Sequence, residues 1–126
     1  MTSLLGEWQI VRYRDEHGLV PPVAGTRPTI TFAPDNRILV VTGCNTVHST
    51  WTLEGADLTL SAPFRTLMYC AEPAGVMEQE TALANALERC VAVEVAAERL
   101  TLLSARREVM IEAEYDASAA GEARPA

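Results

Sequence analysis

The sequence has little of what catalytic, metal or nucleic-acid sites require. It contains two histidines, three cysteines and ten basic residues among 126 residues, and its formal net charge is -7. Ten dispersed basic residues cannot form the positive surface that binds phosphates, so nucleic acid is not an expected partner. His17 and His48 lack the spacing of a tetrahedral metal site, and no Gly-rich phosphate loop occurs. We therefore expect no metal and no cofactor.

Long hydrophobic runs are absent as well. No apolar stretch approaches the roughly 20 residues of a membrane-spanning helix. The opening residues 1–8 contain no basic n-region, no apolar h-region and no cleavage site, which predicts a chain that, as written, is cytoplasmic. With 48% hydrophobic residues, a chain of this length can still bury the core of one domain.

Alternating apolar and polar residues predict strands through most of the chain. In the strand containing His48, the alternation places Val47, Ser49 and Trp51 on the face opposite to His48. Short turns between the strands favour hairpins, hence antiparallel pairing. The predicted strands cover residues 8–13, 29–32, 37–41, 47–53, 58–60, 64–70, 91–95, 99–103 and 108–113.

One segment, residues 73–89, has helical periodicity, with Met77, Leu83 and Leu87 on its apolar stripe and Gln79 largely off it. Three acidic residues near its start predict a solvated first turn that complements the helix dipole. They are Glu72, Glu78 and Glu80. The predicted fold is mostly β (α+β): an antiparallel, curled or barrel-like sheet of roughly eight or nine strands with one helix packed on it. Residues 1–115 form the domain, and residues 116–126, which are small or charged, are expected to form a disordered tail.

Two cysteine-containing motifs stand out. Gly43-Cys44-Asn45 ends an apolar run, and Gly and Asn suit a turn because both tolerate left-handed backbone angles. The second motif is Thr66-x-Met68-x-Cys70. A Leu4-x-Gly6-x-Trp8 opening and a Met-Glu-Gln-Glu helix start at Met77 accompany them. In this order, over most of the chain, the motifs resemble those of the META domain, the HslJ-like heat-shock protein family.

The resemblance implies a compact β-rich domain of the heat-shock-inducible type, with relatives linked to antibiotic tolerance, virulence or protein secretion. It does not imply a reaction. Many such domains are exported or lipid-anchored, so it implies an exported or envelope location as the alternative to the cytoplasm. The family's fold is similar to that of lipid-binding pilot proteins of type III secretion, which makes a protein partner or an apolar small molecule the expected ligand by analogy.

Several site residues can be interpreted in more than one way. Cys44 and Cys70 could be inert buried thiols, a disulfide, a redox pair or part of a metal site, whereas Cys90 is expected in the core. Asn45 could bind a ligand, but an Asx-type turn within its own loop is the simpler interpretation. Trp8 and Trp51 are expected to pack in the core, with an apolar binding cavity as the alternative.

We expect a non-catalytic protein that acts in stress response or envelope maintenance by binding a protein partner or an apolar ligand. The first alternative is a thiol redox module that uses Cys44 and Cys70. The second is a hydrolase, which would need one of two histidines beside a serine and a carboxylate. His48 and Ser49 are neighbours that face opposite sides of a strand, so a catalytic triad is not expected there.

Overall fold

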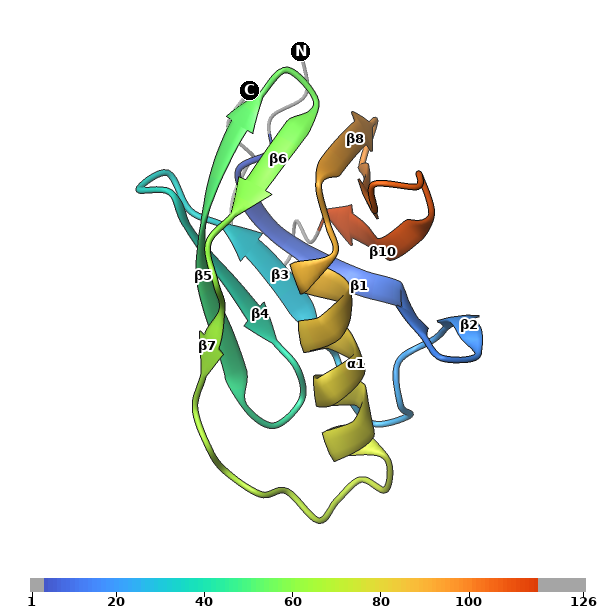
Figure 1. The fold of residues 1–126 in the computed structure, drawn as a ribbon. Helices are drawn as coiled ribbons and strands as arrows, with labels where there is room; N and C mark the ends of the chain where they lie inside the picture. The colour runs from blue at the N-terminus through green and yellow to red at the C-terminus, as the bar shows by residue number, and fades with distance from the viewer. Residues whose placement is uncertain (1–3, 116–126) are drawn as a thin grey trace.

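The computed structural model describes residues 4–115 of this 126-residue chain, so the tail expected over residues 116–126 lies outside the described part. The described residues form ten strands and one helix (Figure 1). The elements are β1 (Gly6–Asp15), β2 (Gly18–Val20), β3 (Thr29–Phe32), β4 (Arg37–Val41), β5 (Thr46–Glu54), β6 (Asp57–Leu60), β7 (Phe64–Arg65), α1 (Val76–Glu88), β8 (Ala92–Ala96), β9 (Arg99–Leu103) and β10 (Val109–Tyr115).

Eight of the strands close into an antiparallel barrel. The sheet runs in the order β10-β9-β8-β6-β5-β4-β3-β1, and β10 pairs again with β1 to close it. The two extra strands are short: β2 extends beside β1, and β7 pairs with β5. The barrel is weakest between β6 and β8, which are matched in the described residues by the single pair Asp57 and Ala92. The predicted mostly β, antiparallel, barrel-like fold with one helix is therefore confirmed.

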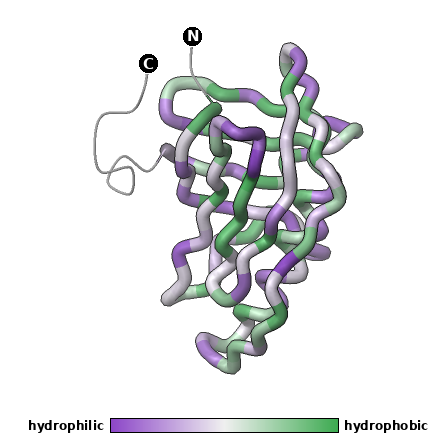
Figure 2. The backbone as a smooth tube through the Cα atoms, turned by 90° about the vertical axis from the view of Figure 1, so that its left-hand side faces the viewer, coloured by the Kyte–Doolittle hydropathy of each residue, from purple (hydrophilic) through white to green (hydrophobic). Residues whose placement is uncertain are grey.

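Alternation along the strands fills the interior. Figure 2 shows hydrophobic and hydrophilic residues following one another along the barrel strands. Ile30 and Phe32 on β3 are fully buried, as are Ile38 and Val40 on the neighbouring strand β4. Val47 and Ser49 on β5 point inward as expected, but Leu53, on the same face, is exposed because it lies near the β5–β6 hairpin end. The period of two thus predicts the buried face where the barrel covers it.

Helix α1 packs against the barrel with Leu83 and Leu87 fully buried, as predicted. Met77 is half-buried, and Val76, one residue earlier, occupies the buried position at the helix start. The expected helix over residues 73–89 is shorter in the structure, because it begins after Gly75 in a left-handed conformation and ends at Glu88. In the described part of the chain, this helix is too short and too polar to cross a membrane.

Two local predictions were wrong. No strand was predicted between residues 13 and 29, but Gly18–Val20 form β2, which pairs with the end of β1. The strand expected over residues 64–70 stops at Arg65, and residues 66–70 leave the sheet. The reason is that the backbone of Met68 bonds to the side chain of Asn45 in place of a neighbouring strand.

Candidate functional site

The centre of the motif region is a buried carboxylate. The Glu80 side chain is 2% exposed, although we expected it in a solvated first turn. Its Oε1 accepts hydrogen bonds from the Thr42 hydroxyl and the Asn45 backbone N–H, both at 2.9 Å. Its Oε2 accepts from Asn45 Nδ2 at 3.0 Å and from Arg65 Nη1 at 3.3 Å. Four donors compensate the loss of water around this charge, so Glu80 joins α1 to the β4–β5 turn.

Asn45 continues the connection to the second motif. Its Nδ2 donates to the Met68 carbonyl at 2.8 Å, and its Oδ1 accepts from the Met68 N–H and the Thr66 hydroxyl, both at 2.8 Å. The expected Asx-type turn within its own loop was therefore the wrong interpretation. The amide replaces a strand partner for residues 66–68, which explains why this segment can leave the sheet with its polar backbone satisfied.

Gln79 lies beside Glu80 and is also buried, contrary to its expected place off the apolar stripe. Its Nε2 donates to the Thr42 carbonyl at 2.8 Å and to the Thr26 hydroxyl at 3.1 Å. Its Oε1 accepts from the Val23 N–H at 2.7 Å. Consecutive polar residues at the start of α1 therefore bind two different loops, which is a structural role for both side chains.

Gly43 has the left-handed conformation that the motif predicted, with φ of 108°. A Cβ at this position would lie 3.1 Å from Val76 Cγ2 and 3.2 Å from Thr26 Cγ2. Both the backbone angle and the close approach to α1 therefore require glycine. Asn45 does not use the left-handed region, so its role in the motif is the hydrogen-bond network of its side chain and backbone N–H.

Cys44 and Cys70 form a disulfide, with their Cα atoms 5.9 Å apart. The bridge ties the end of the exposed segment to the turn that Glu80 holds. Cys90 is a buried free thiol. Its Sγ–H faces the Ala86 carbonyl, and burial raises its pKa to about 12. Such a thiol is not a nucleophile at neutral pH.

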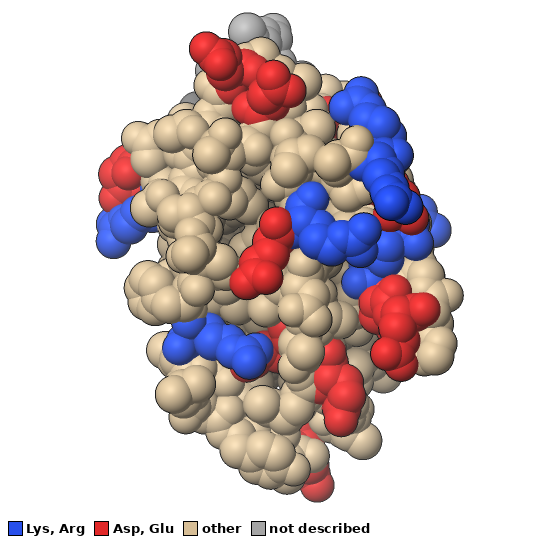
Figure 3. Space-filling view, viewed as in Figure 1, with Lys and Arg blue, Asp and Glu red and all other residues tan. Residues whose placement is uncertain are grey.

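Four large apolar side chains gather on the short segment that these contacts fix. Phe64 is 67% exposed, Leu67 90%, Met68 58% and Tyr69 81%. The segment leaves β7 along the lower edge of the molecule in Figure 1, and Figure 3 shows a broad uncharged area at the lower left of the same view. Isolated exposed apolar residues are ordinary, but four within six positions mark a candidate interaction surface. We call residues 64–69 the apolar segment.

The two tryptophans are packed inside the protein. Trp8 is fully buried, its ring lies edge-on to Tyr115, and its indole N–H donates to the Leu4 carbonyl at 2.9 Å. Trp51 is half-buried against Phe32, and its N–H donates to a carbonyl at the β3–β4 turn. The surface hollows described below are lined by other residues, so these rings serve packing.

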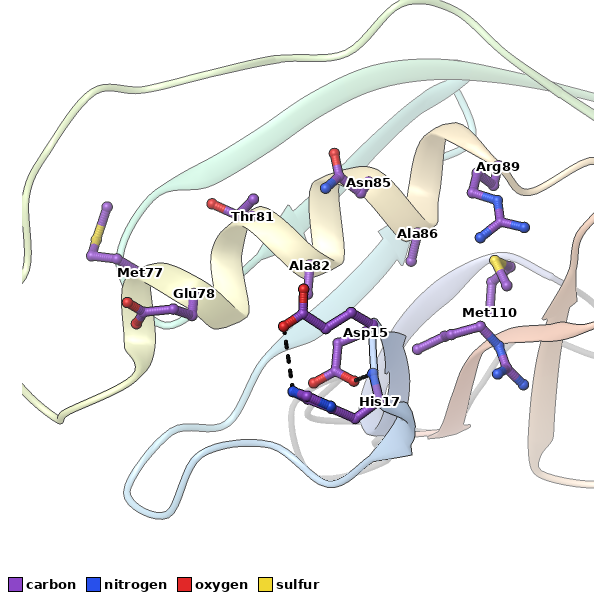
Figure 4. Close-up of a pocket in the computed structure, with 12 residues that line it drawn as sticks. Asp15, His17, Met77, Glu78, Thr81, Ala82, Asn85, Ala86, Arg89 and Met110 are labelled. Carbon is purple, nitrogen blue, oxygen red and sulfur yellow. Dashed lines mark hydrogen bonds and ion pairs between the residues drawn. The ribbon is translucent and has the colours of Figure 1, made fainter.

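The largest hollow described here, about 690 Å³, lies between the β1–β2 turn and α1. Figure 4 shows Asp15 and His17 on one side of it, with Glu78 and Asn85 on the helix opposite and Arg89 just after the helix end. His17 is exposed and faces the equally exposed Glu16, while Arg89 pairs with Glu108. Within residues 4–115, no group of three or more His, Cys, Asp or Glu side chains could hold a metal. The side chains around this hollow do not converge on a common point.

His48 and Ser49 point to opposite sides of β5, as the alternation predicted. The His48 ring stacks on Phe64 with ring centroids 5.0 Å apart, whereas the Ser49 hydroxyl donates to the Ser61 carbonyl at 2.7 Å. These two residues are therefore not paired with each other. His48 instead supports the apolar segment from the outer face of the sheet.

The motif residues Gly43, Asn45, Thr66 and Met68 are thus brought together, whereas the importance of Glu80 was missed. The signal was available, since Glu80 lies three residues before the buried Leu83 and four after the buried Val76, on the same side of the helix. Only the negative charge of Glu80 favoured a solvent-exposed position. The exposed apolar segment was missed because its residues were assigned to a half-buried strand.

Comparison with known proteins supports the motif reading. The family model described as "META domain" matches residues 2–116. Two solved structures share the fold. The first, titled "NMR structure of the protein from Burkholderia xenovorans", has a TM-score of 0.65 and 19% identity and covers 86% of this chain and 81% of its own. The second, titled "NMR structure of the protein", has a TM-score of 0.61 and 22% identity, and the match covers 90% of this chain and 96% of that one. No curated protein sequence matches. The chain belongs to the META domain family.

Proposed function

We propose that this META domain is a non-catalytic binding protein that engages a protein partner through the apolar segment, residues 64–69. The observation that supports the proposal is the exposure of Phe64, Leu67, Met68 and Tyr69 on one short segment. Aromatic residues and methionine are enriched where proteins bind one another. Exposing a contiguous apolar surface to water is unfavourable in free energy, and binding would remove that surface from water. By family resemblance, the setting of this role is stress response or envelope maintenance.

The segment is held in place, which suits binding. Asn45 bonds to both backbone groups of Met68, and the Cys44–Cys70 disulfide fixes the far end. A segment that is ordered before it meets its partner loses less conformational entropy on binding. The contacts at Asn45 and Glu80 therefore act on binding by positioning the exposed side chains.

The disulfide also supports an oxidising compartment as the place of action. Disulfides persist in exported and envelope proteins and are rare where glutathione keeps thiols reduced. Cys44 and Cys70 are bridged, and the third cysteine, Cys90, is buried. We therefore propose the exported or envelope location, which the family resemblance implied as the alternative to the cytoplasm.

A partner on the surface is favoured over an apolar molecule in the barrel. Trp8, Phe32 and Met110 are fully buried in the core cluster, and Trp51 packs against it. An acyl chain would have to displace such packed side chains, whereas a partner needs only the apolar segment as it stands.

Site-specific photocrosslinking tests the proposal. A photoreactive phenylalanine analogue in place of Leu67 should give one discrete cross-linked protein in the native host, whereas the same analogue in place of Leu53 should not. Leu53 is a matched control because it is also an exposed leucine, 42% accessible, but lies at the far hairpin. The cross-linked protein is then identified, produced and titrated against the domain.

Combined Leu67→Ser and Tyr69→Ser should weaken that titrated affinity at least about tenfold, because central apolar contacts contribute most of the binding energy. Leu53→Ser should leave it unchanged. Equal affinities for both variants would show that the apolar segment is not the binding surface.

A further inference from the structure

The backbone of the apolar segment has an open edge. On β7, Arg65 lies opposite Val47 of β5. The next residue, Thr66, donates its N–H to the Thr46 carbonyl at 3.3 Å. In an antiparallel pair, successive residues point their backbone groups alternately toward and away from the neighbouring strand. The N–H and C=O of Arg65 therefore point away from β5.

The alternation continues past the end of β7. Both backbone groups of Met68 are bonded to the Asn45 side chain, on the side of the barrel. Leu67 lies between Thr66 and Met68, whose backbone groups bond toward the barrel, so the same alternation directs the Leu67 N–H and C=O outward. Among residues 4–115, the backbone groups of Arg65 and Leu67 form no hydrogen bond. Two outward residues at a spacing of two, of which Arg65 lies in β7 and Leu67 just beyond it, form a short, unpaired backbone edge.

Two hollows lie along β6 and β7. A hollow of about 170 Å³ separates β7 from α1 and is lined by Arg65, Ala84 and Glu88, among others. It adjoins a second hollow of about 590 Å³ beside β6, since Pro63 and Glu88 line both. The second hollow is lined by β6, by the end of α1 and by Val91, the residue before β8, and we call the two hollows together the groove.

The groove has an acidic rim. Glu88 lines both hollows and Asp57 lines the larger one. Within the described residues, neither carboxylate forms an ion pair, whereas the cation of the groove, Arg65, is paired with Glu80. The unpaired charges at the groove are therefore negative, which favours basic residues on an occupant.

We propose that the occupant is an extended peptide segment with alternating apolar and basic residues, which adds as a strand to the edge formed by residues 65–67. Its backbone would pair with Arg65 and Leu67, its apolar side chains would pack on the apolar segment, and its basic side chains would face Glu88 and Asp57. Addition of a strand to an open edge is an established mode of peptide recognition, and an acyl chain could not satisfy the same backbone groups. The inference rests on the proposed partner-binding function and specifies its geometry.

The probe is the synthetic peptide acetyl-Lys-Val-Arg-Val-Lys-Leu-Arg-amide, with two versions that are N-methylated at alternate residues. In an added strand, one alternate set of peptide N–H groups bonds to the protein and the other faces away. Calorimetric titration should therefore show that the unmodified peptide binds. One methylated version should bind at least about tenfold more weakly, and the other should bind with the affinity of the unmodified peptide. In amide NMR spectra, the Arg65 and Leu67 signals should gain protection from exchange when the unmodified peptide binds.

The charge component has a matched control. Combined Glu88→Gln and Asp57→Asn should weaken the peptide about fivefold at low salt, whereas Glu54→Gln, in the same hairpin but outside the groove, should not. The inference is overturned if both methylated peptides bind equally, if the peptide does not bind at millimolar concentration, or if the protein instead pairs with a second copy of itself. If the native partner still requires Leu67 and Tyr69 after such a result, the proposed function survives and strand addition does not.

Discussion

Asn45 and Glu80 are joined by two hydrogen bonds, one from the Asn45 backbone N–H to Oε1 at 2.9 Å and one from its Nδ2 to Oε2 at 3.0 Å. One carboxylate thus holds both the backbone and the side chain of the motif asparagine. The Asn45 side chain also bonds to Met68 of the apolar segment. Helix α1, the Gly-Cys-Asn turn and the segment form one connected unit.

Glu80→Gln should lower the free energy of unfolding by about 3 kcal/mol, because an amide group in place of one carboxylate oxygen turns a donor toward the donors that Glu80 now accepts. Chemical denaturation monitored by tryptophan fluorescence measures the loss. Glu78→Gln is the control, since Glu78 is exposed in the same helical turn and should change stability by less than about 0.5 kcal/mol. Equal effects of the two variants would mean that the Glu80 network does not stabilise the fold.

Asn45→Ala should release the apolar segment while the barrel remains folded. The variant removes both side-chain bonds to the Met68 backbone and the acceptor of the Thr66 hydroxyl, at a cost of about 2 kcal/mol. Amide hydrogen exchange should accelerate at Met68 and stay slow at Ile30 and Val40 in the barrel. Unchanged protection at Met68 would show that Asn45 does not hold the segment.

Removing the disulfide should destabilise the protein by a different route. Combined Cys44→Ala and Cys70→Ala should lower the free energy of unfolding by about 3 kcal/mol, because the bridge closes a loop with a sequence separation of 26 residues. The Asn45 bonds stay in place, so protection at Met68 should fall less than in Asn45→Ala. Thermal denaturation with and without reductant gives the comparison. A melting temperature that does not respond to reductant contradicts the bridge.

Cys90 should be unreactive in the folded protein and should give a pH dependence of known sign. Its folded-state pKa, about 12, lies above the ordinary value of 9.0, because burial penalises the thiolate. The neutral thiol therefore contributes stability that is fully present below pH 9.0 and is lost as the pH rises toward 12. The stability difference between the native protein and Cys90→Ala should be constant below pH 9.0 and shrink as the pH rises from 9.0 toward 12. Rapid alkylation of Cys90 in the native state at neutral pH would be inconsistent with this environment.

The sequence predicts the barrel well because period-two patterns and short turns act locally. Ile30, Phe32, Ile38 and Val40 alternate in adjacent strands, and their buried faces follow from that alternation. Closure of the barrel depends on pairing between β1 and β10, which are separated by most of the chain. Such a pairing has no local signal, so the sequence supports a curled sheet as readily as a closed one.

The site was harder to predict because it depends on polar burial. Glu80 and Gln79 are charged or polar residues in the first part of a helix, where solvent exposure is the normal expectation. Their burial follows from partners supplied by Thr42, Asn45 and Thr26, which lie more than thirty positions earlier. Residues 66–70 were mistaken for the continuation of a strand because their composition fits one. Their departure from the sheet depends on the Asn45 side chain, which a strand pattern does not reveal.

The central claim is that the motif residues position the exposed apolar segment for binding to a partner. The most direct measurement is the affinity of the cross-linked and identified partner for four proteins. These are the native domain, combined Leu67→Ser and Tyr69→Ser, Asn45→Ala, and the Leu53→Ser control. We expect the serine variant to bind at least about tenfold more weakly, Asn45→Ala to bind more weakly while still folded, and the control to bind as the native protein does. Native affinity in the serine variant and in Asn45→Ala would contradict the claim.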